Sequence, residues 1–250
     1  MDSKILSFLS YNSTGLDNEK IQWINDLVET TNTVCWQLQE HFKATKTANQ
    51  YFKQNFKNFD NFVTAAVRGN LTHAGRPKGG LAQFVNKYYD IKKEKLPCKS
   101  WRLQAQILHI DNYRILWMNV YMPTDPQLQQ IDETEIYETL YEIEKILSDC
   151  SYHDVILGGD WNFDQNRNTG YCRIVSEFLD RYDLKSVWTK FTADYSYCHT
   201  DLSSFSLIDH FFVNENFLNN CLDAAPMHLG DNRSNHSPIM LKIRIPDIQR

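Results

Sequence analysis

Strand-length apolar segments alternate with amphipathic helical segments along all 250 residues of this chain. Apolar runs bounded by turn residues predict strands, and apolar positions three or four residues apart predict helices. We expect strands at 5–11, 33–39, 62–67, 81–85, 102–110, 113–121, 155–157, near Tyr195, 207–213 and 239–245, and helices at 18–28 (with Asn18 as N-cap), 133–148 and 174–182. Asp111-Asn112 between two strands predicts an antiparallel hairpin. Helices do not follow the strands with the regularity of a Rossmann or TIM fold, so a sheet-rich α/β layered fold is favoured.

The chain carries enough apolar material for one sizeable core. Hydrophobic residues make up 42% and aromatic residues 13% of it, and no Pro/Gly/Ser-rich stretch is long enough for a domain linker. We therefore expect a single domain over residues 1–250, monomeric in isolation. No run approaches the roughly 18 apolar residues that cross a bilayer, and the first residues lack a signal-peptide pattern. The sequence predicts an intracellular protein with no membrane partner.

Cysteines and net charge limit the class of protein. The six cysteines include no CxxC pair, which argues against a structural zinc site and favours free thiols. The formal net charge of -5 argues against a broad basic coat for nucleic acid. A nuclease is compatible with this charge, because acidic metal ligands lower the net charge while the binding face keeps local Lys and Arg.

The segment 158–162, Gly-Gly-Asp-Trp-Asn, is the most specific candidate site. It follows a buried strand, so we expect Asp160 and Asn162 at the carboxyl edge of that strand, in a turn where the backbone can approach a ligand closely. The alternative is a turn in which both side chains only cap local amides. Glu40 ends the strand at 33–39 in the same way. A strand-end carboxylate can begin a magnesium site, although an exposed surface Glu is the alternative here.

Further polar residues stand at strand ends or inside apolar runs. Asn12 ends the first strand and Tyr121 ends another, where they could hydrogen-bond phosphate oxygens, with simple packing as the alternative for Tyr121. Asp209 lies inside the apolar run 207–213, where a carboxylate is costly without a partner. His236 precedes the last strand, and pairing with Asp209 would fix its tautomer and raise its basicity. Without Asp209, His236 would be an ordinary structural or exposed histidine.

Two loops offer candidate contacts to nucleic acid. The segment 75–80 is glycine-rich but lacks the Gly-Lys-Ser/Thr ending and the following helix of a P-loop. Its Arg76 and Lys78 could reach a nucleic-acid backbone, or the segment could be a plain hairpin loop. Ser196 and Ser204 belong to a second polar loop, which we expect to contact nucleic acid and to set target preference.

In chain order the candidate segments form a series that covers nearly the whole chain. They are Asn12, Gln39-Glu40, 79–82 (Gly-Gly-Leu-Ala), 119–123 (Asn-Val-Tyr-Met-Pro), 158–162, 206–210 (Ser-Leu-Ile-Asp-His) and 234–238 (Ser-Asn-His-Ser-Pro). This series resembles the endonuclease/exonuclease/phosphatase superfamily. Within it, the segments 36–41 (Trp-Gln-Leu-Gln-Glu-His), 75–82 and 206–210 look most like the apurinic-type endonuclease domains of non-LTR (LINE-type) retrotransposons.

The resemblance implies a four-layered α/β sandwich, with two packed mixed β-sheets flanked by helices, as in DNase I-like proteins. It implies a magnesium-dependent endonuclease, with manganese as an alternative cofactor, that nicks duplex DNA. The nick would leave a 3′-hydroxyl primer for target-primed reverse transcription, which requires access to the nucleus. Such a domain usually forms the N-terminal part of a longer polyprotein that includes a reverse transcriptase.

Metal-site roles also come from the resemblance. Glu40 matches the principal magnesium ligand, and Asn12 matches a residue that supports metal and phosphate. Asp160 matches the residue that orients or deprotonates the attacking water. Asn235 departs from the family pattern Ser-Asp-His, because it puts a neutral amide where a carboxylate stands near the metal. An amide keeps one acceptor oxygen but loses a full charge, so magnesium affinity or occupancy should fall.

The remaining roles concern charge on the phosphate. Asn162 and Tyr121 match residues that stabilise the phosphorane, and Asp209 matches the residue that orients His236, which contacts the phosphate. This division agrees with phosphoryl transfer by positioning and charge compensation.

Several interpretations are compatible with the sequence. Asn235 is compatible with a natural variant of reduced activity, a deliberate substitution, or a domain that binds DNA without cutting it. A cellular repair endonuclease for abasic sites, or a phosphatase of the same fold, is the enzymatic alternative to the retrotransposon domain.

Overall fold

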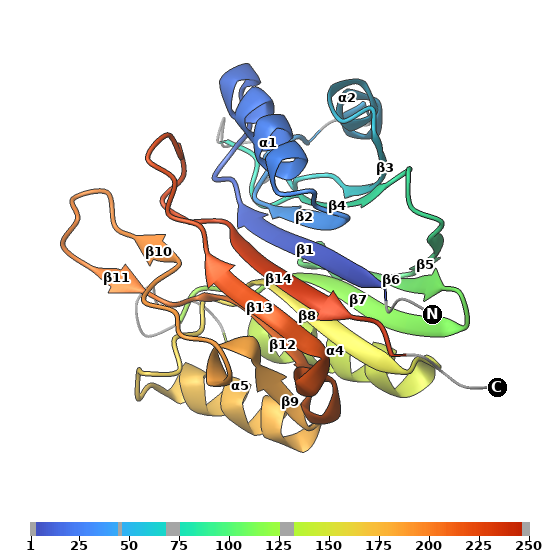
Figure 1. Cartoon of the computed structure of the whole chain (residues 1–250). Coiled ribbons are helices and arrows are strands. Elements are labelled where there is room, and N and C mark those ends of the chain that lie inside the picture. The colour runs from blue at the N-terminus through green and yellow to red at the C-terminus, as the bar shows by residue number, and fades with distance from the viewer. Residues whose placement is uncertain (1–3, 45–46, 69–75, 126–132, 247–250) are drawn as a thin grey trace.

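Two six-stranded β-sheets pack face to face, with helices on the outer face of each (Figure 1). This computed structural model describes residues 4–44, 47–68, 76–125 and 133–246. Each sheet contains both parallel and antiparallel neighbours. The arrangement confirms the four-layered α/β sandwich that the resemblance implied.

The first sheet is built around the N-terminal strand. Its order is β13 (Cys221–Pro226), β14 (Ile239–Arg244), β1 (Ile5–Asn12), β2 (Cys35–Gln39), β4 (Leu81–Asn86) and β3 (Phe59–Thr64). β1 runs parallel to β2 and antiparallel to β14. The chain's first and last described strands are therefore neighbours.

The second sheet contains the predicted hairpin. Its order is β5 (Lys92–Leu96), β6 (Leu103–Ile110), β7 (Tyr113–Tyr121), β8 (Asp154–Asp160), β12 (Asp209–Asn214) and β9 (Leu184–Ser186). β6 and β7 pair antiparallel through the turn at Asp111, as expected, and Asp111 has a left-handed φ of 53°. A separate small hairpin consists of β10 (Tyr197–Cys198) and β11 (Phe205–Ser206), so the strand expected near Tyr195 begins two residues later.

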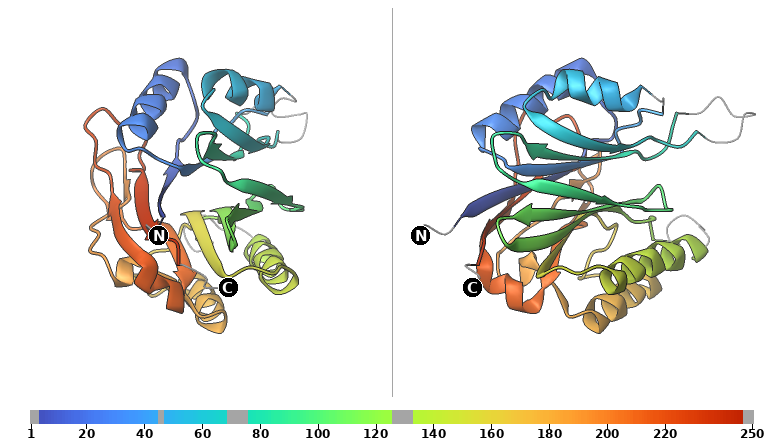
Figure 2. Two further views of the ribbon diagram at one scale, coloured as in Figure 1. Left: turned by 45° about the vertical axis from the view of Figure 1, so that its right-hand side comes forward. Right: turned by 90° about the vertical axis from the view of Figure 1, so that its right-hand side faces the viewer.

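Four described α-helices and two 3₁₀ helices complete the layers. They are α1 (Asn18–Thr30), α2 (Ala48–Asn55), α4 (Thr134–Asp149), α5 (Gly170–Arg181), η1 (Val187–Thr189) and η2 (Glu215–Asn220). In the right-hand view of Figure 2, α1 and α2 lie above the first sheet, and α4 and α5 lie below the second. None of the described helices is long and apolar enough to cross a membrane.

Helix starts differ from the sequence prediction for local reasons. Asp17, rather than Asn18, is the N-cap of α1, because its side chain accepts a hydrogen bond from the Lys20 backbone N–H. Thr169 caps α5 in the same way and starts it before the expected residue 174. α2 was not predicted, because Ala48 and Phe52 are its only buried residues and give too short a pattern.

Buried aromatic residues fill the three interfaces between layers. Phe8 and Trp117 meet edge to face between the sheets at 5.6 Å. Trp36 stacks on Phe84 at 3.8 Å beneath α1 and α2, and Trp161 packs beneath α4 and α5. At roughly 25 cal/mol per Å², burying one Trp contributes about 5 kcal/mol at most.

A polar network crosses the interior between the sheets. Asn119 on β7 donates to the Leu38 carbonyl at 2.9 Å and the Ala82 carbonyl at 3.2 Å, both in the first sheet. Its Oδ1 accepts from Gln39 Nε2 at 2.7 Å. These bonds link strands of the two sheets and fix their relative position, because buried polar groups must keep their partners.

We expect Asn119→Ala to lower the free energy of unfolding by about 3 kcal/mol, because two buried carbonyls lose a donor and Gln39 Nε2 keeps only its bond to Ser10 Oγ. Urea denaturation measures this loss. Asn112→Ala, in the exposed β6–β7 turn, is the matched control and should change stability by less than about 0.5 kcal/mol. Equal effects of the two substitutions would contradict a structural role for the network.

Candidate active site

The polar ends of strands from both sheets meet at one edge of the sandwich. In the first sheet, Asn12 at the end of β1 lies in register with Gln39 at the end of β2. In the second, Asp160 at the end of β8 lies between Tyr121 of β7 and Asp209 of β12. Side chains from distant parts of the sequence are thereby collected at the carboxyl ends of the parallel strands.

Asp160 is a buried carboxylate held by two hydrogen bonds. Its Oδ2 accepts from Asn12 Nδ2 at 2.9 Å, and its Oδ1 accepts from the Asn162 backbone N–H at 3.0 Å. Burial raises the pKa of Asp160, and the charge of Asp209 adds to this, whereas His236 and the two hydrogen bonds lower it. The net shift is upward, so Asp160 is a stronger base than an exposed Asp.

His236 lies between two carboxylates. Its Nδ1 is 2.8 Å from Asp209 Oδ2, and its Nε2 is 3.9 Å from Asp160 Oδ2. All three residues are buried. Burial lowers the pKa of His236, but the charges of Asp209 and Asp160 raise it by a larger amount. The net shift of this pKa is therefore upward. The ring is therefore held as an imidazolium that donates from Nδ1 to Asp209.

Glu40 and Tyr121 form a second pair at the same edge. Tyr121 Oη donates to Glu40 Oε1 at 2.6 Å. Burial raises the pKa of Tyr121, and the charges of Glu40 and Asp160 raise it further. The Glu40 charge also raises the pKa of His236. These mutual influences place Glu40 in the same electrostatic site as the Asp209–His236 pair.

Two site residues adopt left-handed backbone conformations. Glu40, directly after β2, has a φ of 54°, and Asn162, two residues after the end of β8, has a φ of 49°. The Glu40 turn is held by the Gly15 backbone N–H, which donates to its carbonyl at 2.7 Å. Asn162 Nδ2 donates to the Met122 carbonyl at 2.9 Å. Non-glycine residues in this conformation cost about 1 kcal/mol or more and gather at functional sites.

The donor set suits a hard divalent cation. Glu40, Asp160 and Asn12 supply carboxylate and amide oxygens, the ligand types that magnesium prefers. Ligand atoms of Asp160, Asp209 and His236 lie within 4.8 Å of one another, which could also hold a metal ion. In this second set, however, Asp209 and His236 already bond to each other. Glu40, with one oxygen not bound by Tyr121, therefore remains the better candidate for the principal ligand.

Gly158 and Gly159 lie in a different element from the turn that the sequence predicted. They belong to β8 rather than to a turn, and they pair with β7 on one side and β12 on the other. A Cβ on Gly158 would meet Gln37 of the facing sheet, and one on Gly159, at a φ of 143°, would clash with the Val120 carbonyl. The glycines allow β8 to pack closely against its neighbours, which places Asp160 at the edge.

The loop containing Ser196 also has a different role from the expected one. Ser196 is buried, and its Oγ accepts hydrogen bonds from the backbone N–H groups of Ile208 at 3.1 Å and Asp209 at 2.9 Å. The prediction that it contacts nucleic acid is therefore wrong, since it supports Asp209 from inside. Ser204 is exposed on the same hairpin and remains a predicted contact.

The other predicted DNA contacts lie at the surface. The Arg76 guanidinium lies 3.7 Å from the centre of the Phe42 ring, and Lys78 is exposed. Val67 and Lys78 exchange two backbone hydrogen bonds of 2.9 Å, the pairing that a hairpin loop would have at its base. Gly75, the first residue of the glycine-rich segment, lies outside the described residues.

Asn235 sits beside His236 and is half-buried. Its carbonyl accepts from the Cys198 backbone N–H at 2.8 Å. Its side chain makes no hydrogen bond within the described part of the chain. Its predicted role as a metal ligand stays a prediction.

Several supporting residues were not found from the sequence. Ser234 Oγ donates to the Asn12 carbonyl at 2.8 Å, and Asn232 Nδ2 donates to the His236 carbonyl at 2.7 Å. Trp188 Nε1 donates to the Asp209 carbonyl at 3.1 Å. Each acts on a main-chain atom of its partner, and such contacts leave no residue pattern in a single sequence. Only Ser234 lay in a segment already singled out.

His41, next to Glu40, is a buried structural residue. Its Nε2 lies 3.1 Å from the Thr64 carbonyl, and its Nδ1 accepts from the Lys43 backbone N–H at 3.0 Å. This pattern requires the neutral ring with hydrogen on Nε2. Burial lowers the pKa of His41 to about 4. A side chain on Gly80 would meet the His41 ring, so the glycine is needed here.

We expect His41 to reduce the free energy of unfolding by about 2 kcal/mol when the pH falls from 7.5 to 5. Its folded pKa lies below the ordinary value of 6.5, so the unfolded chain takes up the proton first and stability is lost on acidification. Chemical denaturation at both pH values, without divalent metal, measures this effect. His41→Gln should show a smaller pH dependence, while His109→Gln, at a half-buried position on β6, should behave as wild type. An unchanged slope in His41→Gln would contradict the assignment.

Comparisons with known proteins agree on the fold. No protein-family model matches the sequence, and no curated protein matches it significantly. Among solved structures, an AP endonuclease from Leishmania major superposes with a TM-score of 0.75 at 15% identity, covering 97% of this chain and 89% of that one. The endonuclease domain of TRAS1, a telomere-specific non-LTR retrotransposon, superposes with a TM-score of 0.71 at 15% identity, covering 96% of this chain and 99% of that one. An endonuclease/exonuclease/phosphatase family protein from Bacteroides thetaiotaomicron superposes with a TM-score of 0.69 at 15% identity, covering 98% of this chain and 100% of that one.

These likenesses extend over nearly the whole chain and over both sheets. At such low identity they establish the architecture alone. This chain has the fold of the endonuclease/exonuclease/phosphatase proteins.

Proposed function

We propose that this protein is a divalent-metal-dependent phosphodiesterase that nicks duplex DNA. The observation that carries the proposal is the buried set of Asp209, His236 and Asp160, aligned through the two ring nitrogens of His236. Three buried ionisable groups are costly for folding, and such sets are typical of catalytic sites. The likeness to structures of nucleases supports the same function.

His236 and Asp160 divide the proton chemistry. Because His236 donates from Nδ1 to Asp209, its Nε2–H remains available for a phosphate oxygen. Asp160 lies beside it with a raised pKa, so it can orient the attacking water and take its proton. Asn12 holds the Asp160 carboxylate in place.

Asn162 and Tyr121 supply neutral donors for the transition state. One hydrogen of Asn162 Nδ2 is used by the Met122 carbonyl, which leaves the second for a phosphate oxygen. Tyr121 keeps its proton because its pKa is raised well above the ordinary value. Fixed donors of this kind stabilise developing charge without reorganisation.

Glu40, with Asn12 nearby, would hold Mg²⁺ or Mn²⁺. The ion, when bound, neutralises charge on the phosphate oxygens. The DNA flanking the cleaved bond would be contacted by Arg76, Lys78 and Ser204. The positive charges of Arg76 and Lys78 suit contacts to its phosphates.

The biological setting we favour is a retrotransposon. The nick would leave a 3′-hydroxyl that primes reverse transcription, and a reverse transcriptase would be fused or adjacent, with access to nuclear DNA. The order of sequence segments and the likeness to the TRAS1 domain support this setting. A repair endonuclease for abasic sites is the second candidate, favoured by the likeness to the Leishmania AP endonuclease.

Three substrates separate these candidates and a phosphatase of the same fold. We expect the protein with Mg²⁺ to nick intact supercoiled plasmid and to leave ends that a DNA polymerase can extend. Cleavage confined to a duplex with one abasic site would identify the repair enzyme instead. Release of phosphate from a 3′-phosphorylated strand, without nicking, would identify a phosphatase.

We expect Asn235→Asp to lower the Mg²⁺ concentration for half-maximal nicking by about tenfold, because one added charge near the metal is worth roughly 1.4 kcal/mol. Asn216→Asp, an exposed position in η2, makes the same charge change and should have no effect. A magnesium titration of the nicking rate measures both. If neither the wild-type protein nor the Asn235→Asp variant nicks DNA while both still bind it, the protein is a DNA-binding module.

A further inference from the structure

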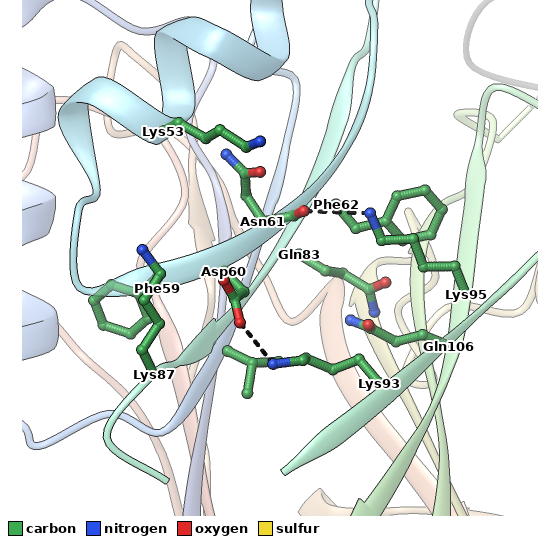
Figure 3. A pocket seen from close by; sticks show the side chains of 11 residues that line it. Lys53, Phe59, Asp60, Asn61, Phe62, Gln83, Lys87, Lys93, Lys95 and Gln106 are labelled. Atoms are coloured by element: carbon green, nitrogen blue, oxygen red, sulfur yellow. Dashed lines mark hydrogen bonds and ion pairs between the residues drawn. The ribbon is translucent and has the colours of Figure 1, made fainter. Parts of the chain in front are cut away.

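A lysine-lined pocket opens between the edges of the two sheets (Figure 3). It has a volume of about 490 Å³, within the range of small-molecule sites. Its walls come from α2, β3 and β4 on one side and from β5 and β6 of the other sheet. None of the candidate active-site residues lines it, so it is a separate feature of the molecule.

The pocket gathers positive charge in a protein of net charge -5. Its titratable lining residues are Lys53, Lys87, Lys93, Lys95 and Asp60. Asp60 pairs with Lys93 at 2.7 Å, so three ammonium groups have no carboxylate partner there. Repulsion between these groups is unfavourable until an anion enters.

Individual lysines show how the charge is held. Figure 3 shows Lys53, from α2, and Lys95, from β5, on opposite walls of the pocket. Lys53 has no hydrogen-bond or ion-pair partner within the described ranges. Lys95 Nζ lies 3.4 Å from the Asn61 carbonyl and 4.8 Å from the centre of the Phe62 ring. Burial lowers the pKa of Lys95, and the Lys53 charge lowers it further.

The floor of the pocket supplies an independent observation. Gln83 is fully buried, and its Oε1 has no hydrogen-bond donor within the described part of the chain. Asn61 Oδ1 is also buried without a donor. Gln106, almost fully buried, brings a further carboxamide to the same floor (Figure 3). Unpaired buried acceptors are costly, and a ligand hydroxyl could satisfy them.

We propose that this pocket binds a phosphorylated sugar, with Lys53, Lys87 and Lys95 on the phosphate and Gln83 and Gln106 on sugar hydroxyls. Lysines on edge strands also hinder edge-to-edge pairing of sheets. That role explains neither Lys53 on a helix nor the unpaired Gln83 oxygen. A compact pocket closed by carboxamides fits a small phosphate ester better than an extended nucleic-acid backbone. The two sources of such a group are a free nucleotide and the phosphorylated end of a strand.

Calorimetric titration of the full chain, in EDTA to suppress metal-dependent binding at the active site, tests the proposal. The probes are pyrophosphate, adenosine, adenosine 5′-diphosphate and a 5′-phosphorylated trinucleotide. We expect the diphosphate to bind more tightly than pyrophosphate and adenosine not to bind. Tighter binding of the trinucleotide than of the diphosphate would identify a strand end as the source, and the reverse order a free nucleotide.

Matched variants locate the site. Lys53→Ala/Lys95→Ala should raise the Kd of the diphosphate by at least about tenfold. Lys185→Ala/Lys242→Ala removes the same charge from exposed ion pairs elsewhere and should change it by less than about twofold. Gln83→Met should weaken the diphosphate but not pyrophosphate, and amide NMR spectra check that each variant is folded.

Three results would overturn the proposal. They are no binding of any phosphorylated probe at about 5 mM, equal losses in the two lysine pairs, or NMR shifts confined to the residues around Asp160. Equal affinity for pyrophosphate and the diphosphate would overturn the assignment of the glutamines to sugar hydroxyls.

Discussion

Asp160→Asn is expected to lower the nicking rate at pH 8 by about 10³-fold, while the free energy of unfolding does not fall. The rate falls because an amide cannot take a proton from water. The fold survives because Asn keeps the size of Asp and can still accept from Asn12 or from the Asn162 backbone. Plasmid nicking and urea denaturation measure the two effects separately.

The stability of this variant should depend on pH in a defined way. Burial and Asp209 raise the folded pKa of Asp160 above its ordinary value of 3.8. Ionised Asp160 therefore destabilises the fold above its folded pKa, and this cost shrinks steadily as the pH falls below that value towards 3.8. In EDTA, Asp160→Asn should be more stable relative to wild type at pH 8 than at pH 5. The exposed Asp180→Asn should change neither rate nor stability, and a wild-type rate in Asp160→Asn would refute its catalytic role.

Much of this site could be anticipated because it is built from strand ends. A strand with buried faces has a readable period, so β7 was predicted with the observed bounds. A polar residue at or just after the end of such a strand stands at the sheet edge, which singled out Asp160 and Glu40. The order of these positions along the chain then showed the resemblance to the endonuclease/exonuclease/phosphatase superfamily.

The pairings themselves could not be read from the sequence. Asn12 and Asp160 are 148 positions apart, and their hydrogen bond depends on how two sheets pack. Ser196 has the polarity of a surface loop residue, yet its hydroxyl caps buried backbone N–H groups. The lysine pocket lies between edge strands of different sheets, and β5 was not predicted because its sequence, Lys-Lys-Glu-Lys-Leu, lacks an apolar face.

Asp209 and His236 are expected to act as one unit. His236→Ala should lower the nicking rate by about 10³-fold and Asp209→Asn by about 10²-fold. The double variant should be no slower than His236→Ala alone, because Asp209 has no ring left to orient once the His236 imidazole is removed. His109→Ala removes a half-buried ring of β6 that pairs with the exposed Glu94 of β5 at 3.2 Å, and it should leave the rate unchanged.

The structure also predicts how the Asp209→Asn rate depends on pH. The Asp209 backbone is held by Trp188 and Ser196, so the position of the side chain should survive the substitution. Removing its charge takes away a cause that raises the His236 pKa. The ring then loses its proton at lower pH, and the alkaline limit of nicking should move to lower pH. Rate losses that multiply in the double variant, with an unmoved pH limit, would mean that the two residues act independently and that Asp209 does not work through His236.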